Sequence, residues 1–395
     1  MELKPVSDWA TDFDVADPAY EANPFPIWDE MRGTCPVAHT DRRGGALLPT
    51  RYDDVAAVAY DTEHFTSRDV GVMPPVAGSR LLVAPPITSD PPFHTDARRI
   101  LLPFFSPAAV DRLEIKTRLI CEELVNAIAA QATADAAGDY AQHIPVRVIA
   151  HMLGIPESDE AIFTDWAVRI FQGTGTDPEN GRDATREILA YFGEQVATRR
   201  AERADDLISA LIDAELDGAP LTDKHILGSC FLLLMAGIDT TWSGIGASLW
   251  HLATHHDDRD RLVADPTLLP MAIEEFLRAY SLVTMARIAS EDTEIAGCPV
   301  HAGDRVLLNF PAGNRDPEKF ERPDEVLIDR EKNRHFAFGI GIHRCIGSNL
   351  ARMEMRVAVG TWLERFPTFA LRPDVEVRWG GAQVRGPREV PVTLG

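Results

Sequence analysis

One segment of this sequence predicts a single helix of unusual length. Apolar residues continue from Thr222 to Thr254, and at 1.5 Å per residue this helix would be about 50 Å long. Thr222 or Asp223 can cap its start. Its longest apolar stretch, Ile226–Ile238, has 13 residues, fewer than the ~20 that a membrane-spanning helix needs. Because the first residues, Met1–Asp14, also lack an apolar leader, we expect a soluble, cytoplasmic protein.

The remainder of the chain predicts further helices and a few short strands. Helical periodicity covers Val110–Ile128, Ile144–Leu153, Glu187–Ala204, Leu207–Leu216, Leu269–Tyr280 and Ser348–Phe366. Strand-like stretches lie at Gly45–Pro49, Arg287–Ile295 and Arg305–Asn309, and the tail Val375–Leu394 predicts hairpins. No Gly/Ser linker divides the chain. We expect one domain over residues 1–395, mainly α-helical with small β-sheets at one side, an α+β fold.

Charge and cysteine content exclude some classes of function. The formal charge is −22 and the pI is about 4.9, which argues against nucleic acid or an anionic membrane as the main partner. The five cysteines are an odd number without a CxxC pair, which is typical of a reducing compartment. They are Cys35, Cys121, Cys230, Cys298 and Cys345. Three histidines near the end of the long helix fit a solvated helix terminus better than a metal site: His251, His255 and His256.

The most specific motif is the ten-residue segment Phe338–Gly347. Its sequence is FGIGIHRCIG, so glycines precede and follow the single cysteine, Cys345, and a predicted helix begins directly afterwards. Glycines let a backbone approach a large flat group closely. A thiolate at a helix N-terminus is stabilised by the helix dipole, which lowers the thiol pKa, and such a thiolate is an axial ligand for haem iron.

A second motif lies in the middle of the long helix, where the sequence is AGIDTT. Asp239 inside an apolar stretch is costly unless it is used or hydrogen-bonded. Gly237 thins the helix, so a ligand could lie against the backbone, and the Thr240 hydroxyl can bond the carbonyl one turn back. Without further context, Asp239, Thr240 and Thr241 could equally form a polar helix face.

Together these segments resemble the cytochrome P450 family. The family pattern Phe-x-x-Gly-x-(Arg/His)-x-Cys-x-Gly is filled at every fixed position, and the other motifs follow in the family's order over nearly the whole chain. The resemblance implies a single P450-like domain with a long central helix over haem b. It also implies that Cys345 is the only protein ligand to iron and that O2 is a co-substrate. The residues implied to border the haem are Phe338, Gly339, His343, Gly347 and Ala236.

The resemblance also gives the acid–alcohol pair a catalytic role. Thr240 would hydrogen-bond dioxygen, and Asp239 would relay protons from solvent. Neighbouring helix residues point about 100° apart, so Thr241 cannot share the role of Thr240.

Four cationic side chains are implied to bind the haem propionates. His94 and Arg98 lie four residues apart on one predicted helix face, and two such donors suit a carboxylate. We expect Asp90 to cap that helix, with Pro91 in its first turn. By resemblance Arg287 and His343 bind propionates as well.

A structural ion pair is also implied. Glu275 and Arg278 lie at i and i+3 and can pair on a helix. The family often adds an arginine at a position where this chain has Glu325, so the third member is open between Arg322 and Arg330.

The segment Arg330–Arg356 carries a net charge of +4, whereas the rest of the chain carries −26. A basic face would steer an acidic ferredoxin-type electron donor, with no reductase or ferredoxin domain fused to this chain. The residues expected on this face are Lys332, Arg334, Arg344 and Arg352. Alternatively, these charges only solvate a helix and bind propionates.

The substrate pocket is expected to be mostly apolar. By resemblance it is lined by Leu232, Met235, Ala236, Val283, Met285, Gln383 and Val384, and the loop Val70–Val83 closes it. Arg68 or Arg80 could bind a substrate carboxylate. The implied activity is monooxygenation, in which one oxygen atom of O2 enters a C–H bond of a small, mostly apolar molecule. A peroxide-driven peroxygenase, which would not need Asp239 and Thr240, and a non-enzymatic haem sensor are the alternatives.

Overall fold

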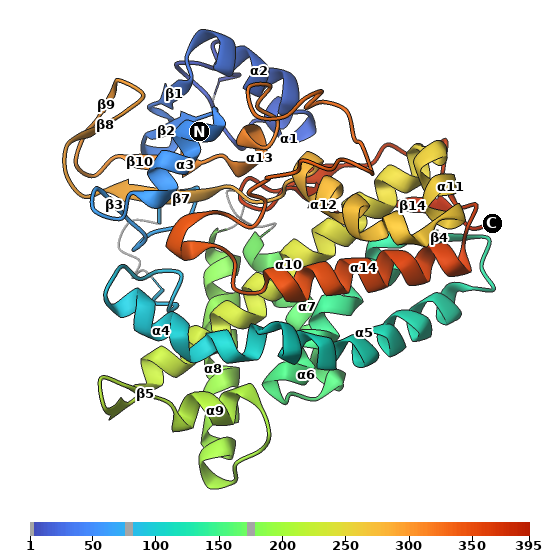
Figure 1. The fold of residues 1–395 in the computed structure, drawn as a ribbon. Coiled ribbons are helices and arrows are strands. Elements are labelled where there is room, and N and C mark those ends of the chain that lie inside the picture. Colours follow the sequence, from blue (N-terminus) through green and yellow to red (C-terminus); the bar gives the residue numbers. More distant parts are fainter. Residues whose placement is uncertain (1–3, 76–81, 172–177) are drawn as a thin grey trace.

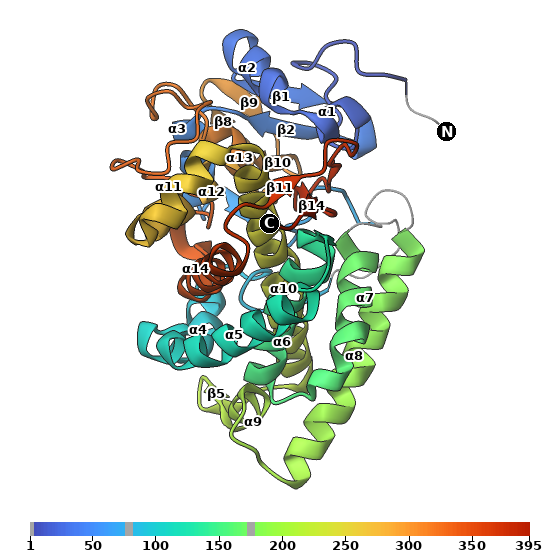
Figure 2. The same ribbon diagram turned by 90° about the vertical axis from the view of Figure 1, so that its right-hand side faces the viewer.

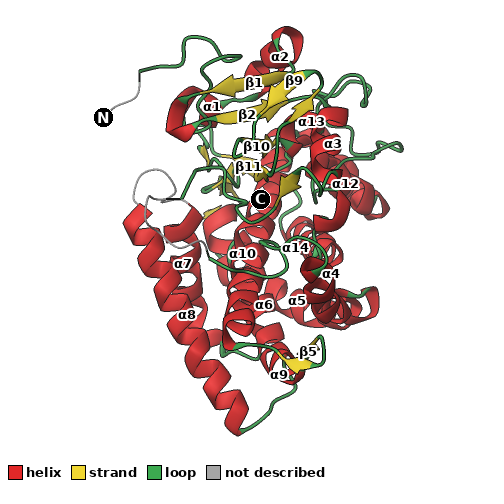
Figure 3. Ribbon diagram, turned by 90° about the vertical axis from the view of Figure 1, so that its left-hand side faces the viewer, coloured by secondary structure: helices red, strands yellow, loops and turns green. Residues whose placement is uncertain are grey.

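The computed structural model describes residues 4–75, 82–171 and 178–395. Most strands gather at one end of the molecule and helices fill the rest, although β5 lies near the opposite end beside α9, as Figure 3 shows. This confirms the expected α+β fold, and it places one large helical body below one main sheet.

The helices are numbered in chain order in Figure 1. They are α1 (Pro18–Ala22), α2 (Phe25–Thr34), α3 (Tyr52–Tyr60), α4 (Phe93–Leu101), α5 (Pro107–Ile128), α6 (His143–Leu153), α7 (Glu160–Phe171), α8 (Pro178–Ala201), α9 (Leu207–Asp213), α10 (Asp223–Thr254), α11 (His256–Ala264), α12 (Leu269–Ala279), α13 (Phe310–Gly313) and α14 (Ser348–Arg365).

The main sheet has the strand order β1-β2-β10-β7-β3, and its only parallel pair is β2 with β10. These strands are β1 (Val37–Thr40), β2 (Ala46–Pro49), β3 (Phe65–Thr66), β7 (Met285–Ala289) and β10 (Arg305–Leu308). A three-stranded sheet joins β4 (Thr133–Asp135), β11 (Ala370–Leu371) and β14 (Pro391–Thr393). The two-stranded pairs are β5 (Glu215–Leu216) with β6 (Ala219–Pro220), β8 (Thr293–Ile295) with β9 (Cys298–Val300), and β12 (Trp379–Gly380) with β13 (Gly386–Pro387).

Helix α10 runs through the middle of the molecule, between α14 on one side and α6 and α8 on the other (Figure 2). Thr222 caps it by accepting a hydrogen bond from the backbone N–H of His225. The helix is long and apolar enough to cross a membrane, but 67% of its most apolar stretch is buried inside the protein. It is therefore the central core helix of the fold.

Several expected boundaries differ from those observed. The segment Leu207–Leu216 is not one helix, because α9 ends at Asp213 and β5 follows it. Arg287–Ile295 holds the end of β7 and the separate strand β8. The expectation that Asp90 caps the next helix is wrong, because α4 begins at Phe93 without a side-chain cap. The Asp90 carboxylate instead accepts from Thr66 and from the backbone N–H of Ser67, which ties α4 to β3.

The expectation of a solvated histidine cluster is also wrong for His251. Its ring is buried and bonds the Tyr280 hydroxyl at 2.7 Å and the Asp258 carboxylate at 2.9 Å. The described residues contain no cluster of side chains that could hold a metal ion. His251 is thus a polar core residue that joins α10 to α11 and to the end of α12.

Helix α14 contains a buried acid whose charge should cost stability. Glu354 is 2% exposed, and burial raises its pKa to about 8. The same carboxyl in the unfolded chain ionises near pH 4.3. Between about pH 4.3 and pH 8 the unfolded chain therefore binds fewer protons than the folded protein, and the free energy of unfolding falls by about 1.4 kcal/mol per pH unit. We expect Glu354→Gln to remove this slope and to gain roughly 3 kcal/mol over the wild type at pH 7.

Denaturant unfolding between pH 4 and 9 measures this effect. The matched control is Glu364→Gln, an exposed acid on the same helix, which should leave the pH dependence unchanged. A gain from Glu354→Gln that is the same at every pH would show that the carboxyl is not protonated in the folded protein.

Candidate active site

The cysteine loop connects the strand region to α14. Gly339 and Gly341 adopt positive φ values of 67° and 73°, which glycine tolerates best. A Cβ on Gly341 would lie 2.7 Å from the carbonyl oxygen of Ala59, so this position has no room for a side chain. The N–H of Cys345 donates to the Phe338 carbonyl at 2.8 Å. The glycines therefore close a tight turn that presents Cys345 on the surface of the loop, just before α14.

The protein surroundings act on the thiol of Cys345 in opposite directions. Although the side chain is exposed, loss of hydration beside the surrounding protein atoms raises its pKa, while a hydrogen bond from the Gly347 N–H and the charges of Arg98, Arg344 and Arg352 lower it. The net shift is upward, so the helix terminus alone does not make this residue a thiolate, contrary to the sequence argument. A coordinated metal ion deprotonates a thiol outright and would complete the ionisation.

One face of α10 presents the residues expected to act on a ligand. Leu232, Ala236 and Thr240 are spaced four residues apart, and all three are at least partly exposed. The Thr240 hydroxyl donates to the Ala236 carbonyl at 2.9 Å, one turn back as the sequence analysis anticipated. Thr241 is buried and points elsewhere. Gly237 does not open the helix toward a ligand, because a Cβ there would meet Ile149 of α6 at 3.6 Å.

Asp239 lies beside this face and is fully buried. Arg388, from the segment after β13, donates to both of its carboxylate oxygens, with Nη2 3.4 Å from Oδ2. Burial raises the pKa of Asp239, and Arg388 opposes this shift. Sequence reasoning missed Arg388, because the two residues are 149 positions apart and no periodicity connects them.

The four predicted propionate ligands converge. The rings of His94 and His343 are 4.3 Å apart, and His343 also bonds the Ser67 hydroxyl at 2.9 Å. Both ring nitrogens of His94 are buried without a protein partner. Burial, followed by Arg287, His94 and Arg98, lowers the pKa of His343 to about 2.

This cluster tests whether the residues fit a haem. Burial lowers the pKa of Arg287 to about 10, and the nearby Asp90 carboxylate only partly opposes this shift. Arg98 donates to the backbone carbonyl of Arg344, next to the cysteine. Two guanidinium groups and two imidazole rings gathered at one place suit a ligand that carries carboxylates. The set His94, Arg98, Arg287 and His343 therefore fits the two propionates of a haem whose iron lies at Cys345.

The third member of the structural ion pair is Arg330. Glu275 and Arg278 are both fully buried and share two hydrogen bonds of 2.8 and 2.9 Å. Arg330 Nε lies 2.9 Å from the second Glu275 oxygen. Arg322, the other candidate, pairs instead with the exposed Glu325. One carboxylate thus joins α12 to the loop that leads to the cysteine.

Removing Arg330 should destabilise the protein much more than removing Arg322. Arg330→Ala leaves Arg278 as the one cation among the described residues that binds the buried Glu275 carboxylate, and it removes the hydrogen bond from Arg330 to the backbone carbonyl of Glu321. We expect the free energy of unfolding to fall by roughly 2–4 kcal/mol. Arg322→Ala breaks only an exposed pair, which is worth about 0–1 kcal/mol. Thermal and denaturant unfolding of the two variants measures the difference. Equal losses would mean that Arg330 is not a working member of the network.

The predicted pocket residues divide into two groups. Leu232, Ala236, Val283, Met285 and Gln383 are at least partly exposed. Gln383 Nε2 lies 3.7 Å from the sulfur of Met285, so the tail does reach β7. Met235 and Val384 are 3% and 4% exposed. Met235 belongs to the main core, and Val384 forms an isolated β-bridge with Val283. These two side chains therefore pack behind the exposed residues and do not line the pocket themselves.

The loop expected to close the pocket is only partly described. Residues 76–81, including Arg80, lie outside the described ranges. Arg68 is 82% exposed at its side chain and lies 3.8 Å from Asp90. The following segment docks tightly on α10, because a Cβ on Gly228 would lie 2.1 Å from the Val83 carbonyl oxygen.

Of the four residues expected on the basic face, Arg352 is already neutralised. Its guanidinium binds the Glu274 carboxylate at 2.6 and 2.9 Å and lies over the Phe338 ring. Lys332, Arg334 and Arg344 are exposed. The available positive charge is therefore smaller than the sequence indicated.

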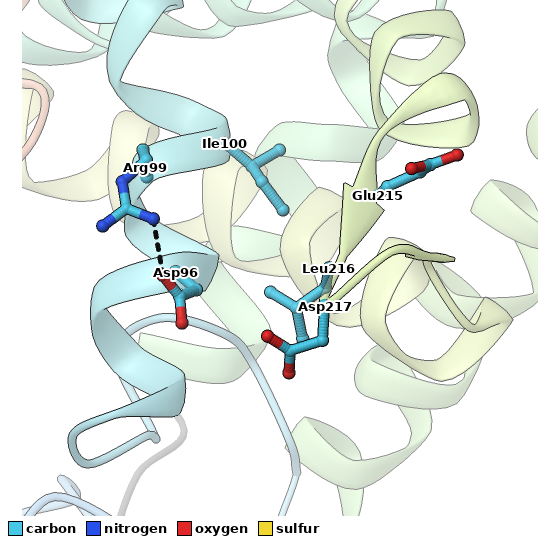
Figure 4. Close-up of a pocket in the computed structure, with 6 residues that line it drawn as sticks. All are labelled: Asp96, Arg99, Ile100, Glu215, Leu216 and Asp217. Carbon is cyan, nitrogen blue, oxygen red and sulfur yellow. Dashed lines mark hydrogen bonds and ion pairs between the residues drawn. The ribbon is translucent and has the colours of Figure 1, made fainter.

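A surface hollow of about 250 Å³ lies between α4 and β5 (Figure 4). Its lining residues are Asp96, Arg99, Ile100, Glu215, Leu216 and Asp217. Arg99 is paired with Asp96 at 2.6 Å, as the dashed line shows. None of these residues belongs to the set described above, so the hollow has no part in the candidate active site.

Comparisons with known proteins agree with this arrangement. The family model named Cytochrome P450 matches residues 181–378. Mycinamicin IV hydroxylase/epoxidase of Micromonospora griseorubida is 34% identical over 373 residues, which cover 92% of this chain and 94% of that protein. Polyketide biosynthesis cytochrome P450 PksS of Bacillus subtilis is 33% identical over 394 residues, with 95% and 96% covered.

Solved structures show the same fold. CYP109E1 from Bacillus megaterium in complex with testosterone superposes with a TM-score of 0.88 at 32% identity, over 95% of this chain and 99% of that one. Fold and sequence therefore point to the same family over almost the full length of the chain.

Proposed function

The chain belongs to the cytochrome P450 family, and on that premise we propose that Cys345 is the axial ligand of its haem iron. The protein is a monooxygenase that uses haem b and O2, as its relatives do. The observation that supports the assignment of residues is the convergence of Cys345 with two arginines and two imidazole rings, which are buried or partly buried beside it.

Each group has a separate task in this proposal. Bound haem supplies the chemistry that activates dioxygen. His94, Arg98, Arg287 and His343 hold its propionates, and the turn around Gly339 and Gly347 lets the backbone lie close to it. Thr240 presents its hydroxyl at the reacting side, and the Asp239 carboxylate moves protons from solvent to that hydroxyl.

We propose that the substrate is a mostly apolar natural product comparable in size to a macrolide or a sterol. The exposed wall residues, Leu232, Ala236, Val283 and Met285, are all apolar, and Gln383 is the one amide among them. The relatives include a mycinamicin IV hydroxylase/epoxidase and a vitamin D(3) 25-hydroxylase, and a structural neighbour binds testosterone.

Reconstitution tests this function. The holoenzyme should oxidise members of a macrolide and sterol panel when supplied with a ferredoxin, its reductase and NADPH, and the inserted oxygen should come from labelled O2. Hydrogen peroxide alone should support little turnover, because Asp239 and Thr240 serve the reaction with dioxygen. Full activity with peroxide and none with the ferredoxin system would favour the peroxygenase instead.

We propose that the electron donor is a ferredoxin that docks on Lys332, Arg334 and Arg344. Opposite charges accelerate association, and salt screens this effect. Arg334→Glu should raise the KM for ferredoxin by roughly 3–10-fold at low salt, and the difference should shrink as salt increases.

The control for this prediction is Arg378→Glu, which makes the same charge change at an exposed arginine of the C-terminal segment. Steady-state reduction rates at several ferredoxin concentrations and ionic strengths measure both variants. Equal effects of the two substitutions on the KM for ferredoxin would show that the net charge of the protein sets the association, and that the face of Lys332, Arg334 and Arg344 is not the docking site.

A further inference from the structure

An ion pair between the buried Asp239 and the partly exposed Arg388, which follows β13, joins the middle of α10 to the loop between β12 and β13. Arg388 contacts both oxygens of Asp239, and its Nη2 also lies 3.2 Å from the carbonyl oxygen of Val384 in that loop. One guanidinium therefore connects the acid of the central helix with the backbone of the loop.

The same loop forms part of the wall of the substrate pocket. Val384 is bridged to Val283, and the neighbouring Gln383 lies against Met285. The loop is thus bonded to the pocket wall on one side and, through Arg388, to Asp239 on the other.

The loop has little room to change its shape. Gly381 has a φ of 100°, and a Cβ there would lie 1.9 Å from the Val384 carbonyl oxygen and 3.4 Å from Arg388 Nη2. The Val384 carbonyl oxygen, which accepts the hydrogen bond from Arg388, is therefore held by a turn that requires glycine at position 381. A shift of the pocket wall at this turn would move Arg388 with it.

The interface between α10 and the segment around β13 holds several polar atoms without a partner in the described part of the chain. Trp242 Nε1, Ser243 Oγ and Arg388 Nε are buried and have no hydrogen-bond partner among the described residues. The Arg388 guanidinium lies 5.4 Å from the centre of the Trp242 ring, so these groups share one interface between α10 and the segment around β13. Buried polar groups of this kind usually bind ordered water.

We propose that Arg388 is the positioning residue of the proton relay, which orients Asp239 and couples it to the pocket wall through Val384. This inference rests on the proposed function of Asp239. Among the described residues, Arg388 is the one charged group that acts on the pKa of this carboxylate. Loss of Arg388 would leave Asp239 buried without a counter-charge, and the carboxyl would then hold its proton more tightly.

The experiment follows the titration of Asp239 in the holoenzyme by infrared difference spectroscopy of the protonated carboxyl. The Asp239→Asn variant identifies the band. Arg388→Met should increase the proton affinity of Asp239 by at least about tenfold, and Arg388→Lys, which keeps the charge, should give a smaller change. Substrate binding should shift the band in the wild type and should leave it in place in Arg388→Met.

Arg385→Met is the matched control, because Arg385 lies in the same loop and covers the Trp379 ring at 4.6 Å. It should leave the titration of Asp239 unchanged. The inference is overturned if Arg388→Met and the wild type titrate alike, or if Arg385→Met shifts the band as much. The reduced carbon monoxide spectrum of each variant separately reports the haem thiolate, so a failure of the proposed function would be seen there and not in the titration.

Discussion

Cys345→Ser is expected to abolish monooxygenase activity and the thiolate-type spectrum of the reduced carbon monoxide complex. A serine hydroxyl is far less acidic than a thiol and does not supply a thiolate's electron density to iron. The loop itself should persist, because Gly339 and Gly341 and the hydrogen bond from the residue 345 N–H to Phe338 do not depend on the sulfur. The measurement is the reduced carbon monoxide spectrum together with turnover.

The other cysteines provide the control for this experiment. Cys121 and Cys230 are fully buried in the main core, and burial raises the pKa of each to about 12. Neither is a thiolate near neutral pH, so alanine at either position should leave the spectrum intact. A wild-type spectrum in Cys345→Ser would refute the assignment of the iron ligand and, with it, the proposed roles of the surrounding residues.

Features set by short stretches of the chain could be predicted from the sequence. The turn of Phe338–Gly347, the i,i+3 pair of Glu275 and Arg278, and the Thr240 bond one turn back to Ala236 each depend on residues close together in the chain. Long-range partners could not be predicted in the same way. Arg330 was open between two candidates, and Arg388 was missed, because their contacts with Glu275 and Asp239 depend on how distant segments pack.

The faces of α10 show a second limit. A helix that is apolar all round gives no periodicity from which to orient it. The family resemblance placed Met235 in the pocket, and the glycine itself suggested that a ligand could lie at Gly237, whereas Met235 lies in the core and Gly237 faces α6. Leu232, Ala236 and Thr240 form the exposed face, and only the packing of α6, α8 and α14 around α10 reveals it.

Thr240→Ala should keep haem, substrate binding and reductant consumption but divert most of the electrons to hydrogen peroxide. Losing a positioned proton donor typically costs about 10²–10⁴-fold in the step that it serves. Thr240 is placed to act because its side chain lies on the exposed face of α10 beside Ala236. Thr240→Ser, which keeps the hydroxyl, should restore much of the coupling, measured as product formed per reductant consumed.

Thr241→Ala is the neighbouring control, and Asp239→Asn separates delivery of protons from their use. Thr241 is 6% exposed and lies about 100° round the helix from Thr240, so its hydroxyl cannot reach the same place. Its loss should change neither coupling nor rate appreciably.

Asp239→Asn should slow turnover more than it uncouples it, because an amide cannot relay protons from solvent to a hydroxyl that is still in place. Full coupling in Thr240→Ala, or equal damage in Thr241→Ala, would place the relay on other residues of α10.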